Sequence, residues 1–403
     1  MRTKAIIHID RLNNNIKSIR ERIGKDRLIC APVKSDAYGH GMLQIAEACI
    51  KAGVYCLGIT DVSEGVELRK NGIKTPILLF SQPHPDEVPQ IIKENLTPFI
   101  SDMEFASFLN KQAEETNRKF AEILGNSAKN TKLPVHMKID TGMGRIGCRS
   151  DDNEYLTLAR FIDSSNGLEL TGIATHFAVS DSTVREDIEY TKKQLECFLN
   201  AVDAVRTAGI DPGIVHAANS GAIILHPDSW LDMVRPGILL YGYKTAKENG
   251  IYTHRSFLER AESLKRQTDY KTISIEPVME LKSSVSLIKK IKKGEFVSYG
   301  RTWISDKDTY IGILPVGYAD GFPRLASNKW EVIINGGKFP VVGRICMNQC
   351  CVDLGEEPQV KRWDEAVIFG GEAEDAAALA EVTGTIPYEI ICNAGKRVQK
   401  VYI

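Results

Sequence analysis

The residues best suited to catalysis lie in the segment from Ala31 to Gly41, which reads APVKSDAYGHG. Within it, Lys34 follows the apolar run Arg27–Val33 (RLICAPV), whose composition is typical of a buried strand. A lysine at the end of such a strand is partly shielded from water, so it can lose its proton and form a Schiff base with an aldehyde cofactor. An ordinary surface lysine could stand at the same place, and position alone does not separate the two interpretations.

Short apolar runs alternate with longer amphipathic stretches from Ile6 to about Tyr243. This alternation predicts parallel strands joined by crossover helices. About eight such units in about 240 residues favour a closed (β/α)8 barrel over an open sheet, with Lys34 at the rim where the active sites of such barrels lie. The expected strands are Arg27–Val33, Val54–Ile59, Pro76–Phe80, Thr97–Ile100, Val135–Ile139, Leu170–Ala174, Ile214–Ala217 and Met233–Arg235, and the expected helices include Met42–Gly53, Val62–Asn71, Asn153–Ser164 and Asp187–Ala208.

A different pattern begins near Ile275, after a charged segment of mixed sign at Asn249–Lys271. We expect that segment to be a solvated helix or a linker. The runs beyond it, such as SVSLIKKI, FVSYG and EVIINGGKF, are rich in β-branched and aromatic residues, which favours strands. The NGG sequence at residues 335–337 lies between two of these runs and predicts a hairpin.

The length and composition indicate a globular protein of two domains. The 403 residues exceed one ordinary compact domain, and 43% hydrophobic with 26% charged residues is the profile of a soluble protein. We predict an α/β N-terminal (β/α)8 barrel in residues 1–245 and a mostly-β domain in residues 246–403, with residues 1–8 available to pair with the second. The net charge of −1 gives no electrostatic reason to expect nucleic acid or a membrane as partner.

The ends and the cysteines favour a cytoplasmic protein. The N-terminal residues lack the apolar core of a signal peptide, and no apolar run approaches the roughly 20 residues that a membrane span needs. The nine cysteines are scattered without CxxC pairs. We therefore expect buried, reduced thiols and no metal site.

The string VKSDAYGHG resembles the cofactor-attachment signature of the alanine racemase family. This resemblance implies a fold type III, pyridoxal 5'-phosphate (PLP)-dependent amino-acid racemase with a barrel, a C-terminal β domain and a homodimer whose active sites borrow residues from the partner. It implies interconversion of L- and D-alanine, supplying D-alanine for cell-wall peptidoglycan, although a catabolic role stays open. Further motifs occur in the family's order: KIDTGMGRIG (138–147), THF (175–177), HAANS (216–220), RPGILLYG (235–242), VSYG (297–300), VGYADGFPR (316–324), VGRICMNQ (342–349) and IPYEI (386–390).

The resemblance assigns the two catalytic bases. Racemisation removes a weakly acidic Cα proton from one face and returns one to the other, for which PLP supplies the electron sink and two groups on opposite faces supply the proton transfer. Lys34 is implied to act on the D-enantiomer and Tyr299 of the partner subunit on the L-enantiomer. A tyrosine has a pKa of about 10, so acting as a base near pH 7 requires about 4 kcal/mol of preferential stabilisation of the phenolate.

The resemblance also assigns residues that bind the cofactor. Arg235 is implied to face the pyridine nitrogen, and because a guanidinium keeps its proton, that nitrogen would stay largely unprotonated. His176 is implied to orient Arg235. Glycine at 237 would let the backbone approach the phosphate closely. The residues implied to hold the phosphate are Tyr38, Ser220, Gly237, Ile238 and Tyr388.

The remaining implied roles concern the substrate. Arg145 matches an arginine that binds the cofactor's phenolic oxygen and the substrate carboxylate, and its planar fork suits that task. The backbone N–H of Met347 is a second implied carboxylate contact. Lys138 matches a lysine that is carbamylated in some relatives, where the new carboxylate holds that arginine. Tyr318, Arg324 and Tyr388 resemble the gate that narrows the entrance to small side chains.

Two departures keep alternatives open. Asn348 stands where the family usually carries aspartate, so a serine or broad-specificity amino-acid racemase remains an alternative. The segment Ala246–Lys271 also looks longer than the corresponding link between the domains of relatives. A PLP-dependent decarboxylase shares the architecture, but its Gly-rich phosphate loop and its Cys/Asp segment are not found in the right context. A non-catalytic PLP carrier is a single barrel and would lack the β-rich residues after about 275.

Overall fold

The computed structural model describes residues 3–124, 131–244, 247–248, 251–252 and 273–403. These residues form two compact units. The barrel unit comprises Lys17–Lys34 and Ala46–Gly237, and the C-terminal unit comprises Met1–Ile16, Ser35–Ile45 and Ile238–Ile403. Two helices, α1 (Ile9–Ile23) and α3 (Met42–Lys51), have residues in both units.

The barrel unit contains eight parallel strands in the order β10-β2-β3-β4-β5-β6-β8-β9. The sheet closes between its two outer strands, where the backbone N–H of Asp232 donates to the Val215 carbonyl at 3.1 Å and the Asp232 carboxylate accepts from the Val215 N–H at 2.7 Å. The predicted (β/α)8 barrel is therefore confirmed. The strands are β2 (Leu28–Pro32), β3 (Cys56–Ile59), β4 (Ile77–Leu79), β5 (Thr97–Ile100), β6 (Leu133–Asp140), β8 (Leu168–Ala174), β9 (Ile214–His216) and β10 (Met233–Val234).

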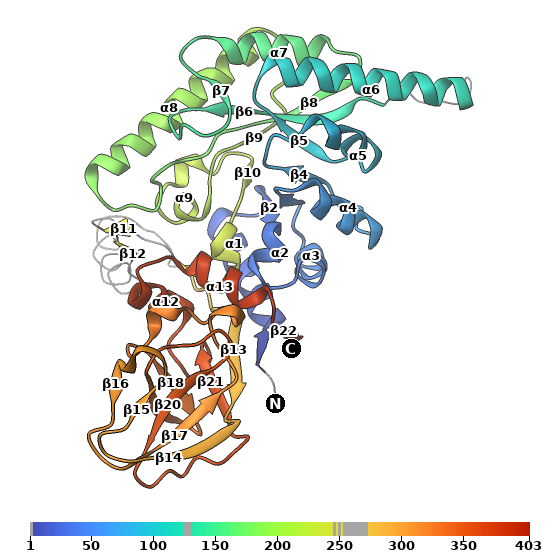
Figure 1. Ribbon diagram of the computed structural model, residues 1–403. Coiled ribbons are helices and arrows are strands. Elements are labelled where there is room, and N and C mark those ends of the chain that lie inside the picture. Colours follow the sequence, from blue (N-terminus) through green and yellow to red (C-terminus); the bar gives the residue numbers. More distant parts are fainter. Residues whose placement is uncertain (1–2, 125–130, 245–246, 249–250, 253–272) are drawn as a thin grey trace. The chain divides into compact units, whose positions relative to one another are not determined.

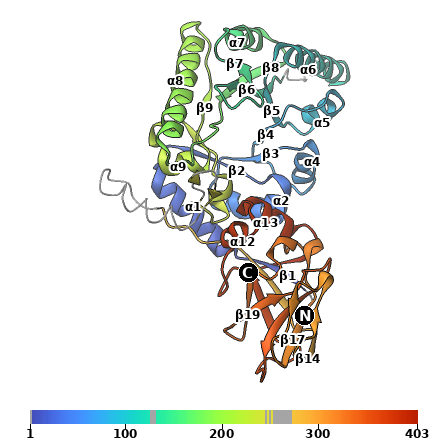
Figure 2. The ribbon, with the colours of Figure 1, turned by 60° about the vertical axis from the view of Figure 1, so that its left-hand side comes forward.

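Helices cover the outer side of these strands, as Figures 1 and 2 show for α6, α7 and α8. Most strand residues are buried, as expected for parallel strands that have helices on one side and a filled interior on the other. Every predicted strand and helix of this region is found, and each bound lies within two residues of the prediction. The helices are α4 (Val62–Lys70), α5 (Val88–Lys93), α6 (Met103–Leu124), α7 (Glu154–Ser164) and α8 (Arg185–Thr207).

The C-terminal unit is built on a nine-stranded sheet in the order β14-β17-β20-β19-β18-β21-β13-β1-β22. The predicted hairpin joins β18 and β19 antiparallel, and Asn335 and Gly336 have φ of 51° and 77°, the left-handed backbone that a two-residue turn of this kind requires. The strands are β1 (Lys4–Ile7), β13 (Met279–Ser284), β14 (Leu287–Ile291), β17 (Thr309–Leu314), β18 (Glu331–Ile334), β19 (Gly337–Val342), β20 (Cys350–Gly355), β21 (Glu365–Phe369) and β22 (Gln399–Tyr402).

Smaller elements complete this unit. Strands β15 (Phe296–Val297) and β16 (Trp303–Ile304) pair with each other, and helices α12 (Ala376–Thr383) and α13 (Pro387–Gly395) precede the last strand. Strand β11 (Lys247–Glu248) pairs antiparallel with β12 (Ile251–Tyr252), and β12 is the only part of the charged segment Asn249–Lys271 that the structure describes. The rest of Asn249–Lys271, where we expect a helix or linker, lies outside the described residues.

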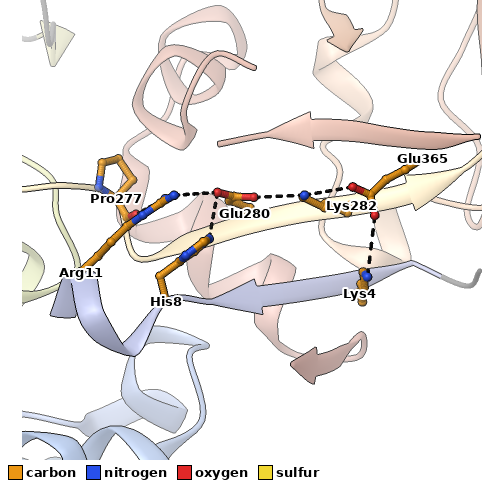
Figure 3. Close-up of polar contacts among 7 residues, drawn as sticks. All are labelled: Lys4, His8, Arg11, Pro277, Glu280, Lys282 and Glu365. Atoms are coloured by element: carbon orange, nitrogen blue, oxygen red, sulfur yellow. Dashed lines mark hydrogen bonds and ion pairs between the residues drawn. The ribbon is translucent and has the colours of Figure 1, made fainter. Parts of the chain in front are cut away.

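The N-terminal strand β1 lies inside the C-terminal sheet, antiparallel to β13 and parallel to β22. A buried carboxylate reinforces this position: Glu280 of β13 is 5% exposed and pairs with His8 at 2.8 Å, Arg11 at 3.0 Å and Lys282 at 3.5 Å (Figure 3). Lys282 also bonds to Glu365 of β21 at 2.9 Å. Because a buried carboxylate needs basic partners, the contacts of Glu280 with His8 and Arg11 fix the segment that follows β1 to the sheet.

All nine cysteines are free thiols, five of them buried and four partly buried. Within the described ranges, no group of cysteine, histidine or acidic residues has the arrangement of a metal site. Among those same residues, no helix combines the length and the apolar character needed to cross a membrane.

Candidate active site

Lys34 lies at the carboxyl end of β2, the first barrel strand in sequence. The N–H of Val33 donates to the Gly58 carbonyl at 2.8 Å, so pairing with β3 continues up to the residue before the lysine. Lys34 is half-buried, as the sequence predicts for a lysine at the end of a buried strand.

A left-handed turn follows Lys34 directly. The four residues Ser35–Tyr38 have φ between 53° and 56°, which is unfavourable for L-residues by roughly 1–2 kcal/mol each. The Asp36 carboxylate accepts from the Met42 N–H at 2.7 Å and pairs with Lys400 of β22 at 2.7 Å. Behind the turn, the ring of His40 bonds through Nδ1 to the carbonyls of Ala37 and Tyr38, each at 3.1 Å. These contacts hold the turn in a left-handed backbone conformation that its residue types disfavour.

Arg235 is a buried cation in the barrel unit, directly after β10, with 6% of its surface exposed. Its guanidinium donates to His216 Nδ1 at 2.6 Å, to the Thr175 carbonyl at 2.7 Å and to the Ala217 carbonyl at 2.9 Å. His176 Nδ1 lies 3.3 Å from it, so the residue predicted to orient this arginine does contact it. Burial lowers the pKa of Arg235 to about 10, and it remains charged at neutral pH. Within the described part of the chain, no ion pair neutralises it.

His136 extends the contact between Arg235 and His216 further into the barrel. His136 Nδ1 lies 2.8 Å from His216 Nε2, and the ring of Phe99 stacks on His136 at 6.2 Å with an interplanar angle of 13°. Gly172 makes room for the ring, because a Cβ there would lie 2.5 Å from His136 Cε1. Burial, and then the charge of Arg235, lowers the pKa of His136 to about 3. The same two causes hold the pKa of His216 well below the ordinary value, so both rings are neutral.

Sequence analysis missed these two histidines as a pair. His216 belongs to the HAANS motif but received no role, and His136 interrupts an otherwise apolar strand. The only signal is this interruption, which by itself is typical of a satisfied core histidine.

Lys138 lies two residues after His136 on β6, so both side chains leave the strand on the same face. It is 4% exposed, and its Nζ donates to the Ile139 carbonyl at 3.2 Å. Burial, followed by the charges of Arg235 and Arg145, lowers the pKa of Lys138 to about 7. A large fraction of this amine is therefore unprotonated near neutral pH, which makes it a nucleophile.

The loop after β6 carries Arg145. It is organised by Asp140, whose carboxylate accepts from the N–H groups of Gly142, Met143 and Gly144 at 2.9 to 3.1 Å. Burial opposes ionisation of Asp140, but these three donors bring its pKa below the ordinary value. Arg145 itself is exposed at the surface of the barrel unit.

Two short helices begin just after the last two barrel strands. Ser220 is the first residue of α9 (Ser220–Leu225), which Asn219 caps by accepting from the Ala222 N–H at 3.1 Å. Gly237 is the first residue of α10 (Gly237–Leu240). Helix starts in these loops of a barrel often bind phosphate through backbone N–H groups.

Two of the predicted phosphate-binding tyrosines are together in the C-terminal unit. The Tyr38 ring lies 6.0 Å from that of Tyr388, the second residue of α13, and 4.7 Å from that of Tyr241. Ile238 is fully buried in the same unit.

Three exposed residues of the C-terminal unit lie on loops that are bonded to one another. Tyr299 is 71% exposed, Met347 56% and Tyr318 45%. The Tyr318 N–H donates to the Cys346 carbonyl at 3.1 Å, and the Ser298 hydroxyl donates to the Arg344 carbonyl at 2.6 Å. The loops that carry a predicted base, a carboxylate contact and a gate residue therefore meet on one part of this unit. The fourth such residue, Arg324, begins a short 3-10 turn and is also exposed.

This combination defines a class: a (β/α)8 barrel with a lysine at the end of its first strand, joined to a β domain that presents an exposed tyrosine. Comparison with known proteins identifies the family within it. Residues 7–245 match the family description "Alanine racemase, N-terminal domain", and residues 278–402 match "Alanine racemase, C-terminal domain". The chain belongs to the alanine racemase family.

Individual relatives agree over the full length. The alanine racemase of Treponema denticola is 45% identical, in an alignment that covers 100% of this chain and 98% of the relative. Among solved structures, the alanine racemase of Clostridium difficile 630 is 34% identical with a TM-score of 0.85, covering 100% of this chain and 96% of that one. The same enzyme in complex with cycloserine gives 32% identity and a TM-score of 0.84, with the same coverage.

Proposed function

We propose that this chain interconverts L- and D-alanine, with pyridoxal 5'-phosphate held covalently by Lys34. The observation that carries the proposal is the placement of Lys34, within the string VKSDAYGHG, at the carboxyl end of the first strand of the barrel. Full-length relatives named alanine racemase support the same reaction.

The described residues fit this cofactor. Its phosphate is an anion, and the starts of α9 and α10 offer backbone N–H groups together with the Ser220 hydroxyl and the side-chain-free backbone of Gly237. In this proposal Ile238, Tyr38 and Tyr388 complete the phosphate site. Each of the three would bind the phosphate through a backbone N–H or a hydroxyl donor.

Arg235 fits the cofactor's ring nitrogen. Its hydrogen-bond partners are two imidazole rings and two carbonyls, which orient the guanidinium without neutralising it. A permanent cation that cannot accept a proton would keep the ring nitrogen unprotonated. That weakens the electron sink and disfavours side reactions such as transamination, so the reaction depends on well-placed bases. His176 would orient Arg235 from the end of β8.

The chain's own residues would move the proton. When bound, PLP supplies the electron sink for the developing charge at Cα. Lys34 exchanges the proton on the face used by D-alanine, and Tyr299 of the partner subunit exchanges it on the face used by L-alanine. The 71% exposure of Tyr299 within a single chain supports a role in the site of another subunit, and hence a homodimer.

The remaining site residues would bind and select the substrate. Arg145 and the Met347 N–H would hold its carboxylate. A carbamylated Lys138 would hold Arg145, and the amine's pKa of about 7 supports this because only the neutral form reacts with carbon dioxide. Tyr318 and Arg324, with the Tyr388 of the phosphate site, would narrow the entrance to small side chains.

Further parts of the proposal, on domains, location and physiological role, follow from membership of the family. We propose residues 1–245 as the cofactor-binding domain and residues 246–403 as the β domain. We also propose a cytoplasmic enzyme that supplies D-alanine for peptidoglycan. Serine is the alternative substrate, since Asn348 follows the proposed carboxylate contact Met347 at a position where the family resemblance implies an aspartate.

One experiment tests the reaction and its rivals. The purified, PLP-loaded protein is incubated separately with L-alanine, L-serine, L-lysine and L-arginine, and enantiomers and amines are resolved by chiral chromatography. We expect D-alanine as the main product. Amine products would instead establish a decarboxylase, and no product from any substrate would refute the proposal.

A lysine pair tests the attachment site. Lys34→Ala should abolish racemisation and the absorbance of the covalently bound cofactor, whereas Lys70→Ala, at an exposed position on α4, should change neither. A Lys34→Ala protein that keeps both properties would refute the assignment of Lys34.

A further inference from the structure

We propose that His136 is a positioning residue for Arg235, acting through His216 as a neutral relay in which His136 accepts the Nε2 proton of His216. The inference rests on the proposed function, because it concerns the arginine assigned to the cofactor. It gives a role to His136, a side chain that takes no part in the mechanism described above.

The direction of the relay follows from its donors and acceptors. A guanidinium has N–H donors and no acceptor, so at 2.6 Å from Arg235 the Nδ1 atom of His216 must be the acceptor. The proton of a neutral His216 is then on Nε2, which donates to His136 Nδ1 at 2.8 Å. His136 in turn carries its proton on Nε2. This is the one arrangement of neutral rings that satisfies both contacts.

The relay would fail if either ring became protonated. A His216 imidazolium has no acceptor to offer Arg235, and a His136 imidazolium cannot accept from His216. Both rings are buried, at 0% and 3% exposure, beside a permanent cation, which keeps them neutral. The acceptor offered to the guanidinium is thus uncharged as well as fixed in place.

The surroundings of His136 favour one ring position. Gly172 on the neighbouring strand leaves the space that the ring fills, and Phe99 lies 6.2 Å from the His136 ring and 6.0 Å from the His216 ring. Packing therefore sets the place of both rings, while the hydrogen bonds set their protonation pattern. The two contributions can be separated by mutation.

A carboxylate in the place of His216 would hold the arginine more strongly but would neutralise it. Neutral acceptors orient the guanidinium and leave its positive charge available to a ligand. His136 contributes by giving the Nε2 proton of His216 a partner. Without that partner, the buried Nε2–H of His216 would be left without an acceptor, while Nδ1 would still have to accept from Arg235, so the ring would be held less firmly.

Three variants test the relay. His136→Leu removes the acceptor, His136→Asn keeps an acceptor oxygen near the position of Nδ1, and Phe99→Leu reduces the packing on both rings while leaving the hydrogen bonds. The tautomer of His216 is read from the ring ¹⁵N resonances of histidine-labelled protein without cofactor. The kcat of racemisation and the ratio of transamination to racemisation are measured with cofactor.

We expect the Nε2–H tautomer of His216 in the parent, in His136→Asn and in Phe99→Leu, from pH 5 to 8. In His136→Leu we expect the ring ¹⁵N resonances of His216 to shift because its Nε2–H loses its acceptor, kcat to fall about tenfold, equivalent to about 1.4 kcal/mol, and the transamination ratio to rise. His136→Asn should recover most of the kcat. If His136→Leu fails to fold, the comparison of His136→Asn with the parent still tests the tautomer.

Two results would overturn the relay: a parent protein in which His216 carries its proton on Nδ1, or a His136→Leu variant with parental His216 ¹⁵N resonances and parental kcat. An equal loss of kcat in Phe99→Leu and His136→Leu would also overturn it, since packing alone would then explain the effect. The tautomer is measured without cofactor or substrate. A protein with the predicted tautomer and no racemisation would therefore refute the proposed function and leave the relay intact.

Discussion

Lys138 offers the most direct test of the electrostatics of the barrel. The side chain is 4% exposed, and its burial together with Arg235 and Arg145 lowers its pKa from 10.5 to about 7. At about 1.36 kcal/mol per pH unit, this difference corresponds to about 5 kcal/mol by which the folded protein disfavours the charged amine. Replacing the amine by an isosteric apolar side chain, Lys138→Met, should remove that penalty.

The pH dependence has a definite sign. Between pH 7 and pH 10.5 the unfolded chain holds the Lys138 proton and the folded chain does not, so stability from this group rises with pH across that window. Below pH 7 Lys138 is protonated in both the folded and the unfolded chain, so the full free-energy cost of burying its charge is present. We therefore expect Lys138→Met to be more stable than the parent at pH 6 by up to about 5 kcal/mol, with the difference shrinking toward pH 10.

Urea unfolding at several pH values, in buffers freed of carbon dioxide, measures this difference. Lys70→Met, at an exposed position on α4, is the control and should follow the parent at every pH. A Lys138→Met advantage that stays constant from pH 6 to pH 10 would contradict the depressed pKa. So would a variant that is less stable than the parent at pH 6.

Carbon dioxide extends the same test. Its reaction with the neutral amine would give a carbamate, an anion beside two arginines, so bicarbonate at pH 7.5 should stabilise the parent and leave Lys138→Met unchanged. With ¹³C-bicarbonate, a carbamate resonance should appear in the parent and be missing from the variant. A parent protein that shows neither effect would exclude the modification under these conditions.

Three further predictions follow from single residues. Tyr299→Phe, which removes the phenolic proton, should reduce kcat at least a hundredfold while leaving the absorbance of the bound cofactor unchanged; near-parental kcat in a chiral assay would exclude this tyrosine as a base. Asp36→Ala, which deletes the contact with Lys400 and the cap of α3, should lower the free energy of unfolding by about 0.5–2 kcal/mol in urea, and an unchanged value would show that the left-handed turn does not depend on it. Gly172→Ala places a Cβ 2.5 Å from the His136 ring and should destabilise the barrel by about 1–3 kcal/mol in thermal unfolding, whereas a neutral result would mean that the ring can move aside.

Sequence patterns predict the barrel well because its signal is local. Each parallel strand is a short apolar run, each helix has its own periodicity, and both can be read without knowing their neighbours. The hairpin at Asn335-Gly336 is predicted for the same reason, since its turn chemistry lies in two adjacent residues.

The order of strands in the C-terminal sheet has no such local signal. Strand β1 lies between β13 and β22, both far from it along the chain, and the expectation that residues 1–8 pair with this domain does not say which strands they join. Apolar patterning predicts that strands exist there but does not specify their order.

The left-handed turn at Ser35–Tyr38 could not be predicted from residue preferences, which disfavour it at every position. It exists because tertiary contacts such as the pairing of Asp36 with Lys400 hold it. The relay was missed for a related reason. His136 and His216 are 80 residues apart, and only closure of the barrel shows that a histidine in an apolar strand has a second histidine as partner.

The pairing of β1 with β22 has a consequence for biogenesis. Ile9 donates its N–H to the Ile403 carbonyl at 2.8 Å, and Ile403 donates to the Ile7 carbonyl at 3.0 Å. During translation, the edge of β1 that faces β22 stays open until the ribosome has made β22, while the segments between them emerge and begin to fold. An exposed strand edge in a nascent chain invites pairing with other chains, so deleting β22 should promote aggregation of newly made protein.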